Sequence, residues 1–380
     1  MPRFTLTQLL VGTALFAILL VFTQSEGCGT RYSTIETLSF SSDDSRILVT
    51  KLTARNARTP GKIYKSNLAR TVSWVDTLTG AGRGMVHQDF KPGNSGPAFR
   101  YWWVGRTSVV CNPTDDRIAF SGFGGGDLTY GAAQTSQTTI PLAQPASNLT
   151  ISNSGRFLAA SGAYHLTVLD TSTLKPALQT QVGDSPLFLG ASLLSFNTDD
   201  TLLIAVGDDG AQVWDVATAT QTATIPIDSE SLVRSIAVMP DDSVVICSDS
   251  STKRYDLSGS LLNTINETGG CVCAASRTSN TLAISDGETV RLCDATDGTT
   301  KRILSTSGVM SFAVSSDDKY LVTGDYDGNV ELYDLLTGTR KWGSTPPGRH
   351  RWPWTIPATI LGIWCWITYR LSDNPGKTSS

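Results

Sequence analysis

Paired carboxylates recur along this chain and have the most obvious capacity for chemistry. Two neighbouring Asp side chains can hold a divalent cation or share the work of an acid and a base. Here they belong to short polar turns between apolar stretches, and the fourth residues of those turns are Asp44, Asp116, Gly155, Asp200, Asp242, Asn280 and Asp318. Asp and Asn tolerate a positive φ and bond to their own backbone, so we expect tight hairpin turns here rather than a catalytic or metal site.

The turns return at a regular interval. Successive fourth residues lie 72, 39, 45, 42, 38 and 38 positions apart. A second marker runs in phase with them, because six units end a strand on Asp: Asp76, Asp170, Asp215, Asp256, Asp294 and Asp334. The second unit has Tyr130-Gly131 in its place. A period near 40 with four short strands per unit predicts an all-β, seven-bladed β-propeller of four-stranded antiparallel blades.

The units resemble the WD-repeat (tryptophan-aspartate repeat) family over roughly residues 30–345. The best matches are LLSFNTDDTLLIAVGDDGAQVWD at 193–215 and FAVSSDDKYLVTGDYDGNVELYD at 312–334. The chain departs from that family in two ways: no Gly-His pair opens a unit, and only one Trp-Asp pair occurs. The buried His-to-Asp network of the family is therefore not expected.

Blade boundaries follow from the repeat, at approximately residues 37–90, 106–141, 146–182, 191–227, 232–266, 269–305 and 308–345. The resemblance also implies that a strand from one terminus completes the blade built by the other. We expect Thr30 to Thr37 to lie beside Asn329 to Tyr333 in blade seven. The competing candidate is the segment from Arg340 to Ser344.

Both ends of the chain are apolar. Residues 1–27 fit a signal peptide or an N-terminal transmembrane anchor, and residues 352–371 fit a C-terminal transmembrane helix before a polar tail at 372–380. An apolar tail packed on the propeller is the alternative for the second segment. Cleavage, retention or lipidation at Cys28 stays open. We expect a membrane-anchored protein with its propeller on the exported side, although the flanking Arg residues give conflicting signals of sidedness.

Composition excludes several classes of function. The formal net charge of −4 argues against a nucleic-acid binder. No nucleophile elbow, zinc-protease motif, phosphate loop or paired zinc motif occurs, so we expect no catalytic residues, no metal and no cofactor. The cysteines within the repeats are expected to be buried small side chains. A bridge from Cys247 to Cys271 or Cys273 stays open.

The long first interval carries the only unusual surface chemistry. Its excess falls at Lys51 to Arg70, between the second and third strands, and at Gly82 to Arg106, between blades one and two. Residues 1–106 hold 13 Lys and Arg against 6 Asp and Glu, which leaves 17 against 28 of the totals of 30 and 34 for the remainder. Basic and aromatic residues together are typical of protein-binding hot spots. The candidate partner-binding residues are Arg55, Arg58, Lys62, Tyr64, Lys65, Arg100, Tyr101, Trp102 and Trp103.

Two functions of different classes follow. The first is a membrane-tethered, non-enzymatic scaffold that binds an unidentified protein partner through the face carrying the blade-one inserts. The second is a propeller enzyme or small-ligand binder, similar to lactonases and hydrolases, with its site at the central channel. Converging ionisable side chains and a metal in the channel would favour the second. The alternative reading of the inserts is a pair of solvated loops.

Overall fold

The computed structural model describes residues 31–344 with short gaps. The gaps are residues 60–61, 91–107, 122–127, 133–136, 143–145, 147, 163–164, 182–192, 208–209, 229–230, 268–269, 271 and 307. Only the backbone is described at residues 31–32, 54–59, 62–70, 83–90 and 181. The two expected terminal helices lie outside the described residues.

The chain divides into two compact units. One comprises Tyr32–Thr53 and Leu68–Thr345 and holds the propeller. The other comprises Met1–Arg31, Ala54–Asn67 and Pro346–Ser380, of which the described part is backbone of strands β1, β2 and β3.

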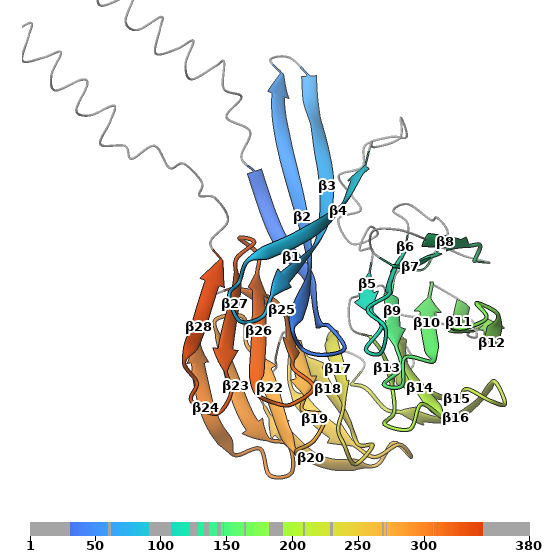
Figure 1. Cartoon of the computed structure of the whole chain (residues 1–380). Helices are drawn as coiled ribbons and strands as arrows, with labels where there is room; N and C mark the ends of the chain where they lie inside the picture. The colour runs from blue at the N-terminus through green and yellow to red at the C-terminus, as the bar shows by residue number, and fades with distance from the viewer. Residues whose placement is uncertain are drawn as a thin grey trace, which may run out of the picture. The chain divides into compact units, whose positions relative to one another are not determined.

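Seven antiparallel sheets of four consecutive strands confirm the predicted propeller blades (Figure 1). Blade 1 contains β1 (Arg31–Phe40), β2 (Arg46–Thr59), β3 (Lys62–Asp76) and β4 (Gly82–Phe90). Blade 2 contains β5 (Val109–Cys111), β6 (Ile118–Ser121), β7 (Leu128–Gly131) and β8 (Gln137–Ile140). Blade 3 contains β9 (Asn148–Ile151), β10 (Phe157–Ser161), β11 (His165–Asp170) and β12 (Pro176–Gln181). Blade 4 contains β13 (Leu194–Phe196), β14 (Leu202–Gly207), β15 (Gly210–Asp215) and β16 (Thr220–Ile225).

The remaining three blades repeat this order. Blade 5 contains β17 (Val233–Val238), β18 (Val244–Ser248), β19 (Thr252–Tyr255) and β20 (Leu261–Asn266). Blade 6 contains β21 (Val272–Ala275), β22 (Thr281–Ser285), β23 (Thr289–Asp294) and β24 (Thr300–Ser305). Blade 7 contains β25 (Val309–Val314), β26 (Tyr320–Asp325), β27 (Val330–Asp334) and β28 (Arg340–Ser344).

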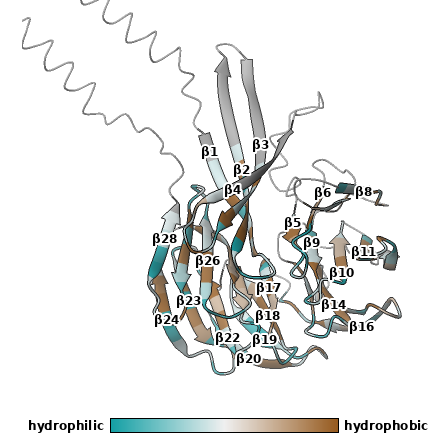
Figure 2. Ribbon diagram, in the orientation of Figure 1, coloured by the Kyte–Doolittle hydropathy of each residue, from teal (hydrophilic) through white to brown (hydrophobic). Residues whose placement is uncertain are grey.

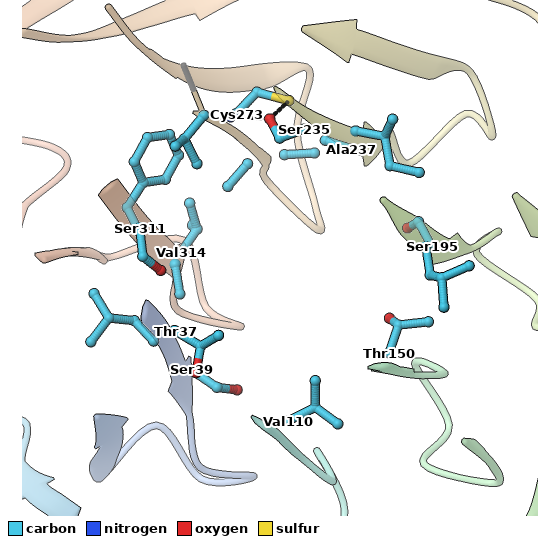
Figure 3. A pocket seen from close by; sticks show the side chains of 18 of the residues that line it. Thr37, Ser39, Val110, Thr150, Ser195, Ser235, Ala237, Cys273, Ser311 and Val314 are labelled. Carbon is cyan, nitrogen blue, oxygen red and sulfur yellow. Dashed lines mark hydrogen bonds between the residues drawn. The ribbon is translucent and has the colours of Figure 1, made fainter. Parts of the chain in front are cut away.

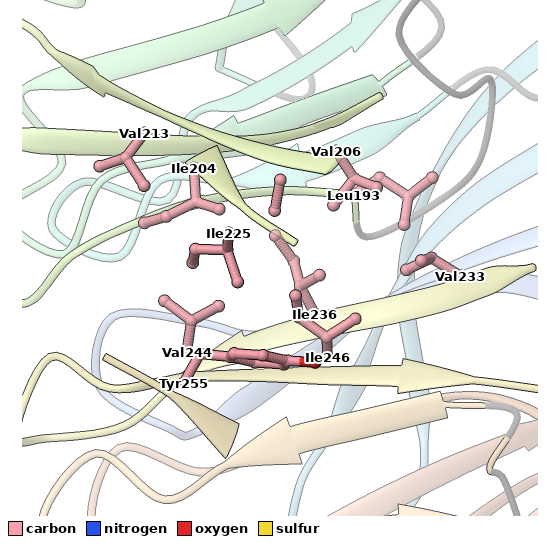
Figure 4. Packing of buried hydrophobic residues seen from close by; sticks show 11 residues of the cluster. Leu193, Ile204, Val206, Val213, Ile225, Val233, Ile236, Val244, Ile246 and Tyr255 are labelled. Atoms are coloured by element: carbon pink, nitrogen blue, oxygen red, sulfur yellow. The ribbon is translucent and has the colours of Figure 1, made fainter. Parts of the chain in front are cut away.

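The hydrophobic core lies between the blades. Seven apolar clusters each draw side chains from two neighbouring blades, and together they run once around the ring. The middle strands are buried on both faces: Leu203 of β14 packs toward blade 3. The next residue, Ile204, packs toward blade 5, as Figure 4 shows. Apolar residues therefore concentrate in the middle strands of the blades, whereas outer strands such as β8 and β16 are polar and mostly exposed (Figure 2). Burial of each such side chain contributes about 1.5–3 kcal/mol.

The prediction that the two blade-one inserts are connections between strands is largely wrong, because much of both segments is itself strand. Most of Lys51 to Arg70 belongs to the strands themselves, because β2 and β3 are 14 and 15 residues long. The segment Gly82–Phe90, predicted as a connection, is the outer strand β4 and pairs with β3 from Leu68↔Phe90 to Val75↔Gly82. A basic, polar stretch can form strand when its neighbour supplies the ladder, since β-propensity depends on context.

The predicted closure of the ring by the N-terminal strand is wrong. β1 is the inner strand of blade 1 and pairs with β2, whereas the competing segment, β28, completes blade 7 beside β27. The inner position of β1 has a physical reason, because Ile35, Leu38 and Phe40 are buried against Val322, Val330 and Leu332 of blade 7. Among the described strands, each blade is therefore built from four consecutive strands.

The ring is closed by side chains instead. The indole nitrogen of Trp342 on β28 donates a 2.7 Å hydrogen bond to the carbonyl of Thr77 in blade 1. The indole ring covers Gly80, whose φ is +70°, and a Cβ there would lie 2.9 Å from the ring. A glycine is required because both its backbone angle and its close approach exclude a side chain.

We predict that Gly80→Ala lowers the free energy of unfolding by about 2 kcal/mol, through the left-handed backbone and the clash with Trp342. Urea unfolding followed by tryptophan fluorescence measures the change. Gly82→Ala is the matched control, since a Cβ at Gly82 meets nothing within 4 Å. Equal stability of the Gly80→Ala and Gly82→Ala proteins would contradict this account of ring closure.

Candidate functional site

A central channel runs along the inner strands of all seven blades. Its volume is about 830 Å³, and its lining comes from β1, β5, β9, β13, β17, β21 and β25 together with adjoining turns. Figure 3 shows the wall, on which hydroxyl groups of Thr37, Thr150, Ser195 and Ser311 alternate with small aliphatic side chains such as Val314.

Charged groups in this lining are few and of mixed sign. The described charged residues of the wall are Glu36, Arg234 and Arg277. Within the described part of the chain, no group of three His, Cys, Asp or Glu residues is arranged to hold a metal ion. A channel with such walls offers hydrogen bonds and a modest apolar surface to a ligand. It brings together no pair of carboxylates for acid and base catalysis among the residues in this lining.

The paired Asp residues are engaged in the turns themselves. The first Asp of a pair caps its own turn: Asp43 accepts hydrogen bonds from the backbone and side chain of Ser45, at 3.0 and 2.7 Å. These bonds, led by the Ser45 hydroxyl, hold the pKa of Asp43 at about 2. Asp199 accepts the same two bonds from Thr201. The carboxylates are thus occupied by local donors.

The second Asp reaches the preceding blade. Asp200 accepts backbone hydrogen bonds from Asn153 and Ser154 of blade 3, at 2.9 and 3.0 Å. Asp242 binds the backbone and hydroxyl of Thr198 in blade 4. Equivalent bonds to the preceding blade are made by Asp44, Asp116 and Asp318. We call these five carboxylates the inter-blade belt.

A positive φ aims the belt residues toward the neighbouring blade. It lies between +55° and +64° at Asp44, Asp116, Asp200, Asp242 and Asp318, and is +72° at Gly155. Blade 3 therefore keeps the backbone shape without the carboxylate. There Asn112 of blade 2 supplies the link by donating its amide to the Gly155 carbonyl at 2.9 Å. Sequence reasoning anticipates the backbone angle, but it misses the inter-blade bonds.

The strand-ending Asp residues also cap turns. Asp170 accepts bonds from the backbone of Ser172 and Thr173 at 3.0 and 3.1 Å, and from the Ser172 hydroxyl at 2.5 Å. The Ser172 hydroxyl is the leading cause that lowers the pKa of Asp170 to about 2. The equivalent caps receive backbone donors at Asp76, Asp215, Asp256, Asp294 and Asp334. Both sets of repeated carboxylates thus serve the fold.

Only part of the predicted partner-binding surface is described. Arg55 and Arg58 lie on β2, and Lys62, Tyr64 and Lys65 lie on β3, with their backbones described. The predicted residues Arg100, Tyr101, Trp102 and Trp103 lie outside the described residues.

Lys51 of β2 and Asp325 of blade 7 form a basic and acidic pair near the paired strands β2 and β3. Lys51 on β2 is half-buried, and burial lowers its pKa while the carboxylate of Asp325 opposes that shift. Its amine also lies next to Gly328, in the turn that follows β26. Asp325 ends β26, and the connections after β22 and β26 carry Asp286, Glu288 and Asp327, so acidic residues gather at these ends of blades 6 and 7. Asp286 and Asp325 cap these turns.

Comparison with known proteins gives one match. Residues 298–334 match the family model described as WD domain, G-beta repeat. The matched segment runs from the turn before β24 to the end of β27. No curated protein matches the sequence. The match and the seven blades together support a WD-repeat propeller, and that class suggests a protein-interaction scaffold, typically non-enzymatic.

The predicted membrane segments at residues 1–27 and 352–371 lie outside the described residues. Over the residues that the structure describes, no helix has the length and apolar character needed to cross a membrane.

We predict that Asp242→Gly destabilises the protein by about 1–2 kcal/mol, because it keeps the positive φ but removes the acceptor for Thr198. Urea unfolding of Asp242→Gly, Thr198→Val and the double variant forms a double-mutant cycle. We expect a coupling free energy near 1 kcal/mol. Strict additivity would show that the belt carboxylate and the Thr198 hydroxyl contribute independently. Asp242→Asn, which retains an oxygen acceptor, is the conservative control.

A second prediction concerns the dependence of stability on pH in the acid range. The pKa of Asp170 is lower in the folded protein than in the unfolded chain, so its contribution is complete above pH of about 4. That contribution falls as the pH drops toward the folded value of about 2. The difference in urea midpoint between wild type and Asp170→Asn should therefore shrink between pH 5 and pH 2. Ser172→Ala, which removes the leading hydrogen bond, should weaken the same dependence. Parallel pH profiles for wild type and Asp170→Asn would contradict the assignment.

Proposed function

We propose that this WD-repeat propeller is a membrane-tethered, non-enzymatic scaffold that binds a protein partner through its blade-one hairpin, defined as the paired strands β2 and β3. The observation that supports this proposal most strongly is the length of β2 and β3. The corresponding second and third strands of the other blades have four to six residues, against 14 and 15 in blade 1 (Figure 1).

The composition of the hairpin supports a binding role. Residues 51–70 carry six Lys and Arg residues and no Asp or Glu. A long basic hairpin adds nothing that a blade requires, since the other blades are complete with short strands. Its charge fits an acidic partner surface, where complementary potentials raise the association rate and discriminate against wrong partners.

Tethering to a membrane is the second part of the proposal. It rests on the apolar segments at residues 9–22 and 352–369, which carry no Asp, Glu, Lys or Arg. A tether would concentrate the scaffold on one surface and so favour repeated engagement of a partner that is held at the same membrane.

The test replaces Ala54–Asn67 by Asn-Gly, which suits a two-residue hairpin turn. Full-length wild-type and shortened proteins are tagged, expressed in the native host and cross-linked before quantitative mass spectrometry. We expect the shortened protein to keep the wild-type unfolding midpoint to within a few degrees and to lose the partners enriched by the wild type.

A charge-only variant sharpens the test. Arg55→Gln, Arg58→Gln and Lys62→Gln together should reduce partner enrichment about tenfold or more, given the salt-sensitive contribution expected of such charges. The matched control is Lys175→Gln, an exposed Lys in the turn before β12. An unchanged partner set in the shortened protein would refute the hairpin as the binding element. Loss of the protein from the membrane fraction on deletion of residues 352–371 tests the tether independently.

A further inference from the structure

Three small side chains meet at the interface between blades 5 and 6. Cys247 lies on β18 directly opposite Ser235 of β17 in the antiparallel register. The Ser235 hydroxyl lies 3.1 Å from the sulfur of Cys273 on β21, and it accepts the Cys273 backbone N–H at 2.7 Å (Figure 3). Cys247 belongs to the same apolar cluster as Cys273, and the Thr252 hydroxyl lies 3.5 Å from its sulfur. The two thiols therefore lie at one interface, on neighbouring blades, and Ser235 neighbours both.

Access to the two sulfurs is unequal. Cys247 is 0% exposed, whereas Cys273 is 5% exposed and belongs to the wall of the central channel. A small reagent that enters the channel meets Cys273 first, and Cys247 lies behind it. Both thiols are free in this structure. Burial, reinforced by the neighbouring Cys273, raises the pKa of Cys247 well above its ordinary value, so that thiol is a slow nucleophile while it stays buried.

We propose that Cys247 and Cys273 form a reversible disulfide that ties blade 5 to blade 6, with a low-molecular-weight disulfide reaching the pair through the central channel. The Cys273 thiolate attacks one sulfur of the reagent, forms a mixed disulfide and releases one small thiol. The sulfur of Cys247 then attacks the sulfur of Cys273, and the Cys247 proton passes to the departing small thiolate, which leaves as the second small thiol. The two protein thiols are thus oxidised, and the reagent is reduced to two thiols.

The proposal does not depend on the hairpin or on the tether. It depends on the thiol pair and on the channel beside it. The same interface holds a third thiol, Cys293, which belongs to the same apolar cluster but is not among the residues that line the channel. Cys293 therefore provides a matched control for the specificity of the reaction.

The test incubates folded full-length protein with bis(2-hydroxyethyl) disulfide at pH 8, blocks free thiols after denaturation and maps the products by mass spectrometry. We expect a loss of 2 Da and a peptide pair that joins Cys247 to Cys273. The link should be absent in Cys247→Ser and Cys273→Ser, retained in Cys293→Ser and reversed by dithiothreitol. The oxidised wild type should melt about 5 °C higher than the reduced protein.

Several outcomes would overturn the proposal. All thiols could stay free after an incubation that oxidises a solvent-exposed dithiol peptide in the same tube. The reaction could stop at a mixed disulfide on Cys273, or the bridge could join Cys271 to Cys247. Because the mapping on the wild type needs no variant, poor folding of a Ser variant leaves these outcomes readable.

Discussion

Closure of the ring is the constraint on which the rest of this structure depends. Each blade buries both faces of its middle strands against its neighbours, so an open ring would expose two apolar faces at once. Blade 7 and blade 1 meet without sharing a strand. Their interface is held by the packing of Ile35 over Gly324, the bond from Ser316 to Asp44 and the docking of Trp342 on Gly80. Side-chain contacts thus do at this interface what a shared ladder of backbone hydrogen bonds would otherwise do.

The repeated Asp pairs follow from the same constraint. A turn that only reverses the chain needs one capping residue and one residue that tolerates a positive φ. Both residues can be recognised from the sequence of a single repeat. The second carboxylate has a further role, because its donors lie 44 residues away for Asp242 and 272 residues away for Asp44. A local pattern therefore predicts the turn, but it cannot predict the inter-blade belt, whose partners are set only by the closed ring.

The same difference between features set within one repeat and features set by contacts with distant residues explains how much of the fold the sequence predicts. Seven blades follow from period and turn chemistry. The place of the first strand does not, because RYSTIETLSF has alternation that suits an inner or an outer strand equally. The burial of Ile35 at 1% decides for the inner position. The 72-residue interval between the first two turns predicts connections at the inserts, because the extra length exceeds what a regular blade needs. The pairing of Gly82–Phe90 with β3 depends on the partner strand and is seen only in the structure.

The interface between blades 5 and 6 departs from the others in a way that connects these points. Asn280 occupies the belt position in blade 6, and its described hydrogen bond goes to Thr296 of its own blade. Beside the Ser235–Cys273 bonds and a bond from Asn263 to the Ala295 carbonyl, this interface is crossed by Arg254 of blade 5. Arg254 is buried, pairs with Asp241 and donates to the carbonyl of Ala295 in blade 6. Burying a guanidinium is costly unless its hydrogen bonds are satisfied, and Ser243 supplies a third at 2.7 Å. The thiol pair lies at this same interface, so a covalent bond there would reinforce the one described boundary where a buried cation replaces the carboxylate belt.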